Sequence, residues 1–193
     1  MKSIRFQRLI ALSAFIVLIA SAAAARAQAT ASDDDKKFVE AALRGGMAEV
    51  DLGQLAVKKG ASDDVKQFGQ KMVDDHTRMG NEMKVVAGKI GVTPPSMTTP
   101  SNMALKAKLE VLSGDSFDKA YISAMVKGHE EDLKDFKNEA ASGTSPEVKR
   151  AASQGATVVS HHLAMIRKIA QVHNVTVSRN GGTVGSGAAA NGR

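Results

Sequence analysis

The sequence contains no cysteine and no tryptophan, and it has a single tyrosine. Without a thiol the chain cannot form a disulfide, bind a metal through a thiolate or carry a lipid on an N-terminal cysteine. It also lacks a glycine-rich phosphate loop, a G-x-S-x-G nucleophile motif and an H-E-x-x-H zinc motif. No nucleophile and base stand at a readable spacing, so an enzyme is the weakest of the functional classes considered.

Only one long apolar run is present, and it lies at the N-terminus. A basic start is followed by an apolar segment over residues 9–25 and by the small-residue cleavage pattern Ala25-Arg26-Ala27. This pattern predicts a secretory signal peptide over residues 1–27. The alternative is an uncleaved membrane anchor, although the run is short for a membrane span. We therefore expect a periplasmic or secreted protein with no transmembrane segment after cleavage.

The expected mature chain also has no large excess of positive or negative charge. The full sequence carries 26 basic and 20 acidic residues, and removal of residues 1–27 takes away four of the basic ones. Arg179 and Arg193 lie beyond the last apolar pattern, so residues 28–175 are balanced at 20 against 20. The basic pI of the full chain is therefore no sign of nucleic-acid binding, and we expect no nucleic-acid partner. The charge pattern does not indicate a protein partner or an oligomeric state.

Most of the mature chain repeats apolar residues at alternating steps of three and four, which is the spacing of one helix face. Ser62, Asp115 and Ser145-Pro146-Glu147 are typical helix starts, and glycines follow the ends. Because the turns are short, neighbouring helices should pack antiparallel. The pattern predicts four long helices, over about residues 32–60, 62–91, 115–143 and 145–175.

The stretch between the second and third long helices does not follow this pattern. Prolines interrupt residues 92–100, and a short amphipathic segment with Leu105, Leu109 and Leu112 precedes Gly114. We interpret it as a crossover containing a short helix on the side of the bundle. The predicted fold is all-α, an up-down four-helix bundle over residues 28–175, followed by a disordered Gly/Ser-rich tail over 176–193.

Three histidines occupy positions of the apolar stripes: His76, His129 and His162, one on each of the last three long helices. On the first helix, Glu49 is the carboxylate that one stripe places inward, although a second stripe leaves open that Glu49 lies at the edge. Counted from the turns at about 1.5 Å per residue, His76 and His129 stand nearly level, with His162 one to two turns higher. A single inward cluster is therefore geometrically feasible.

Three imidazoles and a carboxylate suit Zn, Cu, Ni or mononuclear Fe, so His76, His129, His162 and Glu49 are the predicted metal ligands. Asp75 and Asp132 flank two of the histidines, where they can accept hydrogen bonds from the second ring nitrogens. The same residues also fit a hydrogen-bonded layer that sets the helix register with no ligand. Sequence spacing does not separate these two interpretations.

Methionines and helical glycines are the other unusual residues near the histidines. Thioethers favour Cu(I), but methionine also fills irregular core space where aromatic residues are scarce, and this second role is the one we expect. The methionines concerned are Met72, Met79, Met83, Met125 and Met165. Close helix packing or room around a site would compensate for the helical glycines, and close packing is the reason we expect. These glycines are Gly45, Gly46, Gly53, Gly69, Gly128 and Gly155.

Several segments together resemble a known exported family, domain of unknown function 4142. The segments are Phe38 to Ala42, Glu49-Val50-Asp51-Leu52-Gly53, Met72-Val73-Asp74-Asp75-His76, Ser113-Gly114 to Tyr121-Ile122, His129 and His162. The resemblance covers about residues 33–173 and implies a ferritin-like four-helix bundle in an exported protein with no established activity. It implies no site residues of its own.

Two hypotheses of different class follow. The first is an exported, periplasmic, ferritin-like bundle that binds a transition metal through its core histidines. The second is a non-catalytic envelope or stress-response protein that binds a partner, with the polar layer only setting the helix register. The Glu-x-x-His pairs that mark di-iron bundles are absent from the chain, which argues against a di-iron oxidase.

Overall fold

The structure, a computed structural model, describes residues 30–176 as an all-helical domain. No strand occurs within these residues. The predicted signal peptide over residues 1–27 and the predicted tail beyond Thr176 lie outside the described residues. The five helices are α1 (Asp33–Lys59), α2 (Asp63–Lys89), α3 (Pro100–Glu110), α4 (Gly114–Ser142) and α5 (Pro146–Val172).

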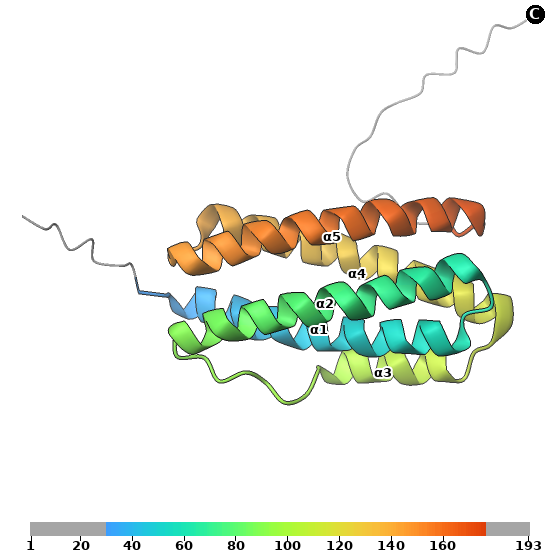
Figure 1. The fold of residues 1–193 in the computed structure, drawn as a ribbon, viewed down its shortest axis with the longest axis horizontal. Helices are drawn as coiled ribbons and strands as arrows, with labels where there is room; N and C mark the ends of the chain where they lie inside the picture. The colour runs from blue at the N-terminus through green and yellow to red at the C-terminus, as the bar shows by residue number, and fades with distance from the viewer. Residues whose placement is uncertain (1–29, 177–193) are drawn as a thin grey trace, which may run out of the picture.

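The four long helices lie side by side, and the short helix α3 runs along α1 (Figure 1). Short turns make α1 and α2 one antiparallel hairpin and α4 and α5 another. Because α3 carries the chain back along the bundle, α2 and α4 run in the same direction (Figure 1). The predicted all-α fold and its crossover with a short helix are confirmed. The predicted up-down arrangement is not confirmed, because the crossover makes α4 parallel to α2. None of the helices in the described part of the chain is long and apolar enough to cross a membrane.

The helix starts follow local side-chain chemistry, with two departures from the sequence prediction. Ser145 caps α5 by accepting a hydrogen bond from the Val148 amide, as predicted. Ser62 is the N-cap residue of α2, but its hydroxyl donates to the Asp118 carboxylate instead of capping the helix. The prediction that Asp115 caps the third long helix is wrong, because α4 already begins at Gly114, whose φ of +59° suits glycine.

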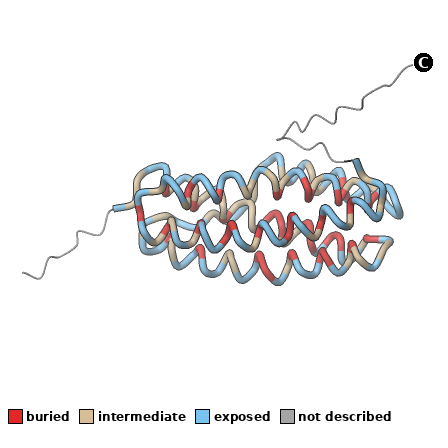
Figure 2. Tube along the Cα trace, turned by 90° about the horizontal axis from the view of Figure 1, so that it is seen from above, coloured by how far each residue is buried: buried red, intermediate tan, exposed pale blue. Residues whose placement is uncertain are grey.

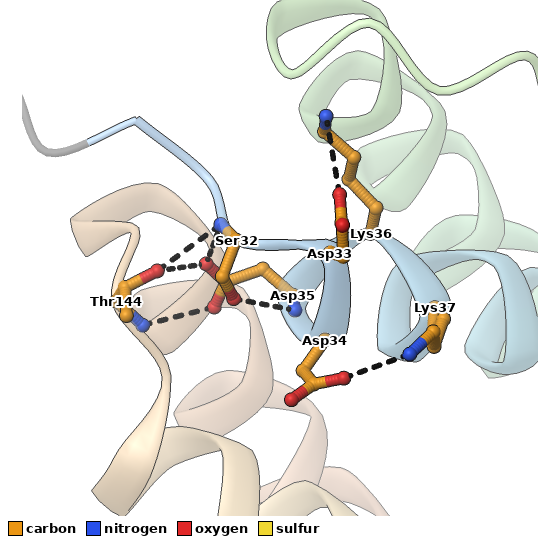
Figure 3. Close-up of polar contacts among 7 residues, drawn as sticks. All are labelled: Ser32, Asp33, Asp34, Asp35, Lys36, Lys37 and Thr144. Atoms are coloured by element: carbon orange, nitrogen blue, oxygen red, sulfur yellow. Dashed lines mark hydrogen bonds and ion pairs between the residues drawn. The ribbon is translucent and has the colours of Figure 1, made fainter.

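Two buried aspartates join the hairpins at opposite ends of the bundle. Asp35 in the first turn of α1 accepts hydrogen bonds from both the amide and the hydroxyl of Thr144 (Figure 3). It also accepts from the Ser145 amide at 3.2 Å. Asp118 in α4 accepts from the Ala61 and Ser62 amides, each at 2.9 Å. Each aspartate thus accepts hydrogen bonds from the backbone amides in the turn of the other hairpin. These contacts place the starts of α1 and α5 together and those of α2 and α4 together.

The two hairpins are an internal repeat with a constant offset of 83 residues. The offset separates Asp35 from Asp118, Gly60 from Gly143 and Ser62 from Ser145. The hairpins also end alike, because the Val92 amide donates to Ala87 O at 2.9 Å and the Val175 amide donates to Ala170 O at 2.8 Å. Residues before these valines, Gly91 and Asn174, both have positive φ. The frame of the bundle is therefore two copies of one helical hairpin.

The apolar core is divided into two clusters along the bundle. Buried positions recur along every long helix and alternate with exposed ones (Figure 2). One cluster is centred on Phe68, Phe117 and Tyr121, and the other packs around Val39 and Phe136. The polar residues that contribute to neither cluster and are still buried include Glu49, Asp75, His76, His129 and His162.

Helical glycines serve two different purposes in this packing. A Cβ added to Gly53 would lie 2.6 Å from Gly69 O, and one added to Gly155 would lie 2.2 Å from the Phe136 ring, so close packing is confirmed there. At Gly45 and Gly46 the prediction of close packing is wrong, because an added Cβ would meet no atom within 4 Å. These two glycines border open space instead.

We expect Asp118→Ala to lower the free energy of unfolding by about 3 kcal/mol, because two buried backbone amides and one hydroxyl lose their acceptor. Urea or guanidinium unfolding monitored by circular dichroism measures the change. Asp115→Ala is the control, since its exposed ion pair with Lys119 should contribute less than about 1 kcal/mol. Equal effects of the two substitutions would contradict the role of Asp118.

Candidate metal centre

Three buried imidazoles from three helices meet in the middle of the bundle. His76 on α2 is 5 % exposed, and His129 on α4 and His162 on α5 are 0 % exposed. One ring nitrogen from each lies within 4.8 Å of the other two. The ring centroids are 5.3 to 6.0 Å apart, and the Phe68 ring packs 6.2 Å from His129 and 6.3 Å from His162. The sequence prediction that these three histidines share one cluster is correct in position.

The tautomer of His129 follows from its backbone contact. Its Nδ1 lies 2.9 Å from Met125 O, and a carbonyl oxygen only accepts, so Nδ1 carries the hydrogen and donates. Burial lowers the pKa of His129, which keeps the ring neutral at pH 7. The other nitrogen, Nε2, therefore bears a lone pair, and it is buried without a hydrogen-bond partner.

His162 is held in the opposite tautomer by a carboxylate. Its Nε2 lies 2.8 Å from Asp75 Oδ2. Burial opposes ionisation of Asp75, but the hydrogen bond from His162 and the ion pair with Lys71 hold its pKa at about 2. Burial lowers the pKa of His162 to about 4, so a neutral ring donates from Nε2 to an ionised carboxylate. Its Nδ1 is then a buried lone pair without a partner.

His76 completes the set. Burial, together with the neighbouring His129 and His162, lowers its pKa to about 3, and its Nε2 is buried without a partner. Three neutral rings thus lie close together, and each has one buried nitrogen without a partner, an arrangement that buried polar groups normally avoid. A metal about 2.0–2.1 Å from each nitrogen would bring the nitrogens to roughly 3.4 Å from one another, so small inward ring movements would form a three-nitrogen site.

The two aspartates proposed to support the histidines lie in different places. Asp75 accepts from His162 across the α2–α5 interface, not from its sequence neighbour His76, and it also pairs with Lys71 at 3.0 Å and with Arg78 at 2.8 Å. Asp132 interacts with His129 through its charge. The Nδ1 hydrogen of His129 goes to Met125 O instead.

Glu49 faces inward but stands beside the histidine cluster. Its side chain reaches α4, where Oε1 lies 3.7 Å from the position of a Cβ on Gly128. Burial raises the pKa of Glu49 to about 7, and its Oε2 has no partner. Asp132 is 83 residues after Glu49, at the equivalent position of the repeat. Burial and the charge of Glu49 raise the pKa of Asp132 to about 7 as well. Two protonatable carboxyl groups therefore lie near one another, and one of them, Asp132, interacts with His129.

The methionines near the histidines in sequence lie mostly in the apolar core, as expected. Met72 and Met125 belong to one core cluster and Met83 to the other. Sequence reasoning missed a different feature, a cavity of about 630 Å³ that reaches His76 and is lined by Met47, Met97, Met103, Gly46 and Gly80. Only the 83-residue repeat, which relates these glycines to larger residues, carries a sequence signal for it.

Comparison with known proteins identifies a family and a fold. The family described as "Domain of unknown function (DUF4142)" matches residues 20–169, which is most of the chain. No curated protein matches the sequence.

Three solved structures share the helical fold at low sequence identity. A DUF305 fragment from Deinococcus radiodurans has a TM-score of 0.66 and 16% identity, and the match covers 74% of this chain and 99% of that one. A DUF305 protein from Streptomyces coelicolor has a TM-score of 0.65 and 13% identity, with 76% and 98% covered. CopM in the Cu(I)-bound form has a TM-score of 0.60 and 18% identity, with 72% and 96% covered. The chain is similar to these structures in fold.

We expect Glu49→Gln to remove a pH-dependent loss of stability from the metal-free protein. The pKa of Glu49 rises from the usual 4.5 to about 7 on folding, so the wild-type stability is retained below pH 4.5 and falls as pH rises towards 7. The variant should be more stable than the wild type at pH 8, by about 3 kcal/mol, and equal to it at pH 4. Chemical unfolding across this pH range tests it, and parallel curves would contradict it.

Proposed function

We propose that this chain, which belongs to the DUF4142 family, binds a transition-metal ion through His76, His129 and His162. Two observations carry the proposal: one ring nitrogen of each histidine lies within 4.8 Å of one from each of the other two, and each ring has one buried nitrogen without a hydrogen-bond partner. The opposite nitrogens of His129 and His162 are already engaged by Met125 O and Asp75. Such contacts orient ligating histidines and raise their basicity, so the site is organised before an ion arrives.

The chemistry of the site supports a small set of metals. Neutral imidazoles suit Zn, Cu, Ni and mononuclear Fe. The chain has no cysteine, and none of these ions requires a thiolate ligand. CopM, whose fold this chain shares, was solved in the Cu(I)-bound form. Copper is for that reason the first metal to test. We treat Glu49 as a fourth ligand that would have to rotate towards the histidines, and Asp132 as a nearby acid.

The two carboxyl groups supply a way to balance the charge of a bound ion. With pKa values of about 7, Glu49 and Asp132 hold protons for part of the time at neutral pH. A cation at the histidines would stabilise their ionised forms, so metal binding would release protons from them. A divalent ion would demand more of this compensation than a monovalent one.

Export is the second part of the proposal. The basic, apolar and small-residue pattern of residues 1–27 favours a signal peptide. A chain without cysteine is also compatible with an oxidising compartment. The protein would then meet its metal in the periplasm or outside the cell. Fractionation of cells that express the full chain, followed by N-terminal sequencing of the product, distinguishes cleavage after Ala27 from retention as an anchor.

A ligand-free structural layer is the competing function, and one contact favours it. The Asp75–His162 hydrogen bond joins α2 to α5 with no ion involved. The bundle would then serve as an envelope or stress-response protein whose surface binds a partner. The two experiments below separate this role from metal binding.

We expect the metal-free mature protein to take up about one equivalent of Cu(I) or Zn(II), and His76→Gln to weaken binding by at least about 100-fold, because one of three ligands is lost. Competition with a coloured chelator measures the affinity. His161→Gln is the matched control, since His161 precedes His162 but is exposed. No uptake by the wild type, or equal losses in both variants, would contradict the site.

We expect Asp75→Asn to weaken metal binding by about 10- to 100-fold, because His162 loses the carboxylate that orients it. The same titration gives the affinity, and thermal unfolding of the metal-free variant gives its stability. Asp74→Asn is the control, because Asp74 is exposed and contacts Gln70 instead. A loss of metal-free stability in a protein that binds no metal would support the structural layer instead.

A further inference from the structure

His76 borders a cavity that reaches the surface. The cavity, of about 630 Å³, lies between α1, α2 and the crossover, and we call it the crossover cavity. Its lining includes His76, Gly46 and Gly80 near the centre of the bundle, and Met97 and Met103 near solvent. Met97 is 64 % exposed and Met103 is 46 % exposed. The cavity therefore connects solvent with the histidine cluster.

The outer wall of the crossover cavity is held in place by specific contacts with α1. Arg44 donates from Nη1 to Met97 O at 2.8 Å, and the Thr98 hydroxyl donates back to Arg44 O at 3.0 Å. Further along, Lys106 of α3 pairs with Asp51 of α1 at 3.4 Å. These contacts fix the crossover over the cavity at both of its segments, so the opening is part of the built structure.

The internal repeat shows why there is open space beside His76 on the first hairpin. The residue equivalent to Gly46 in the second hairpin is His129, and the residue equivalent to Gly80 is Leu163, each 83 positions later. Both of these larger side chains are buried. On the first hairpin the glycines leave space where an added Cβ would touch nothing within 4 Å. Glycine destabilises a helix interior relative to alanine, so two glycines beside His76 are expected where the open space itself has a use.

The lining of the crossover cavity favours soft metal ions through its sulfur atoms, whereas its charges balance. Its acidic residues, Asp51 and Glu110, are matched by two lysines, Lys84 and Lys106, so it attracts neither anions nor cations strongly. Its three thioethers come from α1, the crossover loop and α3, as Met47, Met97 and Met103. Thioether sulfur binds Cu(I) well and harder divalent ions poorly.

We infer that the crossover cavity is the access route for Cu(I), with Met47, Met97 and Met103 as transient ligands on the way to His76. This inference rests on the proposed metal site and adds the identity of the ion and its path. Transfer along this route is a ligand exchange in which copper stays Cu(I), so no oxidant, reductant or proton is consumed.

A second cavity, of about 390 Å³, also reaches His76 but has a different character. It shares Gly46 and Gly80 with the crossover cavity. Its other lining residues include the acidic Asp132, Asp135 and Glu139, together with Met79 and Met83. Those two methionines share one helix, and Met83 is packed in the apolar core. This cavity lacks solvent-exposed thioethers from separate elements, so it is the less suitable path for Cu(I).

The first test fills the space beside His76 without changing a ligand. Because Gly80 lines both cavities, this test asks whether the open space is used, and the second test decides between the two cavities. Gly80→Leu places in α2 the residue that the second hairpin carries at the equivalent position, where it should fill the space beside His76. Mixing metal-free protein with a coloured Cu(I) chelate gives both the loading rate and the final stoichiometry. We expect loading to slow by at least about tenfold at unchanged stoichiometry, because the ion must then wait for local opening of the bundle.

Gly88→Leu is the matched control for this test. Gly88 lies on the same helix, an added Cβ there also meets open space, and it does not line the crossover cavity. It should load Cu(I) at the wild-type rate. Equal rates for Gly80→Leu and Gly88→Leu would overturn the access route.

The second test removes the thioethers and keeps the cavity. The triple substitution Met47→Leu, Met97→Leu and Met103→Leu should slow Cu(I) loading and leave Zn(II) loading unchanged, because Zn(II) gains little from thioether sulfur. Met165→Leu, outside the cavity lining, is the control. Unchanged Cu(I) loading, or equal slowing of both ions, would overturn the role of the methionines. If the wild type itself binds neither ion, the proposed function fails; if it binds both and neither variant alters Cu(I) loading, only the route fails.

Discussion

The free-energy cost of burying three imidazole nitrogens without partners is the main constraint on this structure. An apolar side chain at each of these positions would make one continuous core from the two clusters around Phe68 and Phe136. Instead His76, His129 and His162 interrupt it, and burial keeps the rings neutral. Neutral rings with bare nitrogens are poor core residues and good metal ligands, because the lone pair that finds no donor in the protein is the one a cation binds.

The bundle accommodates this layer within a symmetric frame. Asp35 and Asp118 secure the two hairpins to each other's turns, and the equivalent carboxylates Glu49 and Asp132 stand together near mid-bundle. The histidines break the symmetry. His129 is equivalent to Gly46, so an imidazole closes the core on one side and a glycine leaves it open on the other. A duplicated hairpin thus supplies stability, while the differences between its copies supply the candidate site and its access.

Much of the fold was predictable from local patterns. The apolar spacing and helix starts gave four long helices with ends close to those observed, and the prolines after Val92 gave the crossover. The Ser62 hydroxyl did not behave as a capping group, because Asp118, distant in sequence, competes for it. The stripe positions of the three histidines were enough to predict a shared interior cluster. Their tautomers were not predictable, since these depend on Met125 O and on a carboxylate from another helix.

The contrast between Asp75 and Gly46 shows where sequence information ends. Local sequence patterns set the helical periodicity and the inward faces, because these depend on neighbours within a few positions. Only the tertiary structure decided that Asp75 serves His162 and not the adjacent His76, that Glu49 stands beside the cluster, and that Gly46 and Gly80 open a path to it. Those outcomes depend on how helices rotate and pack against one another, and local spacing carries no information about that rotation.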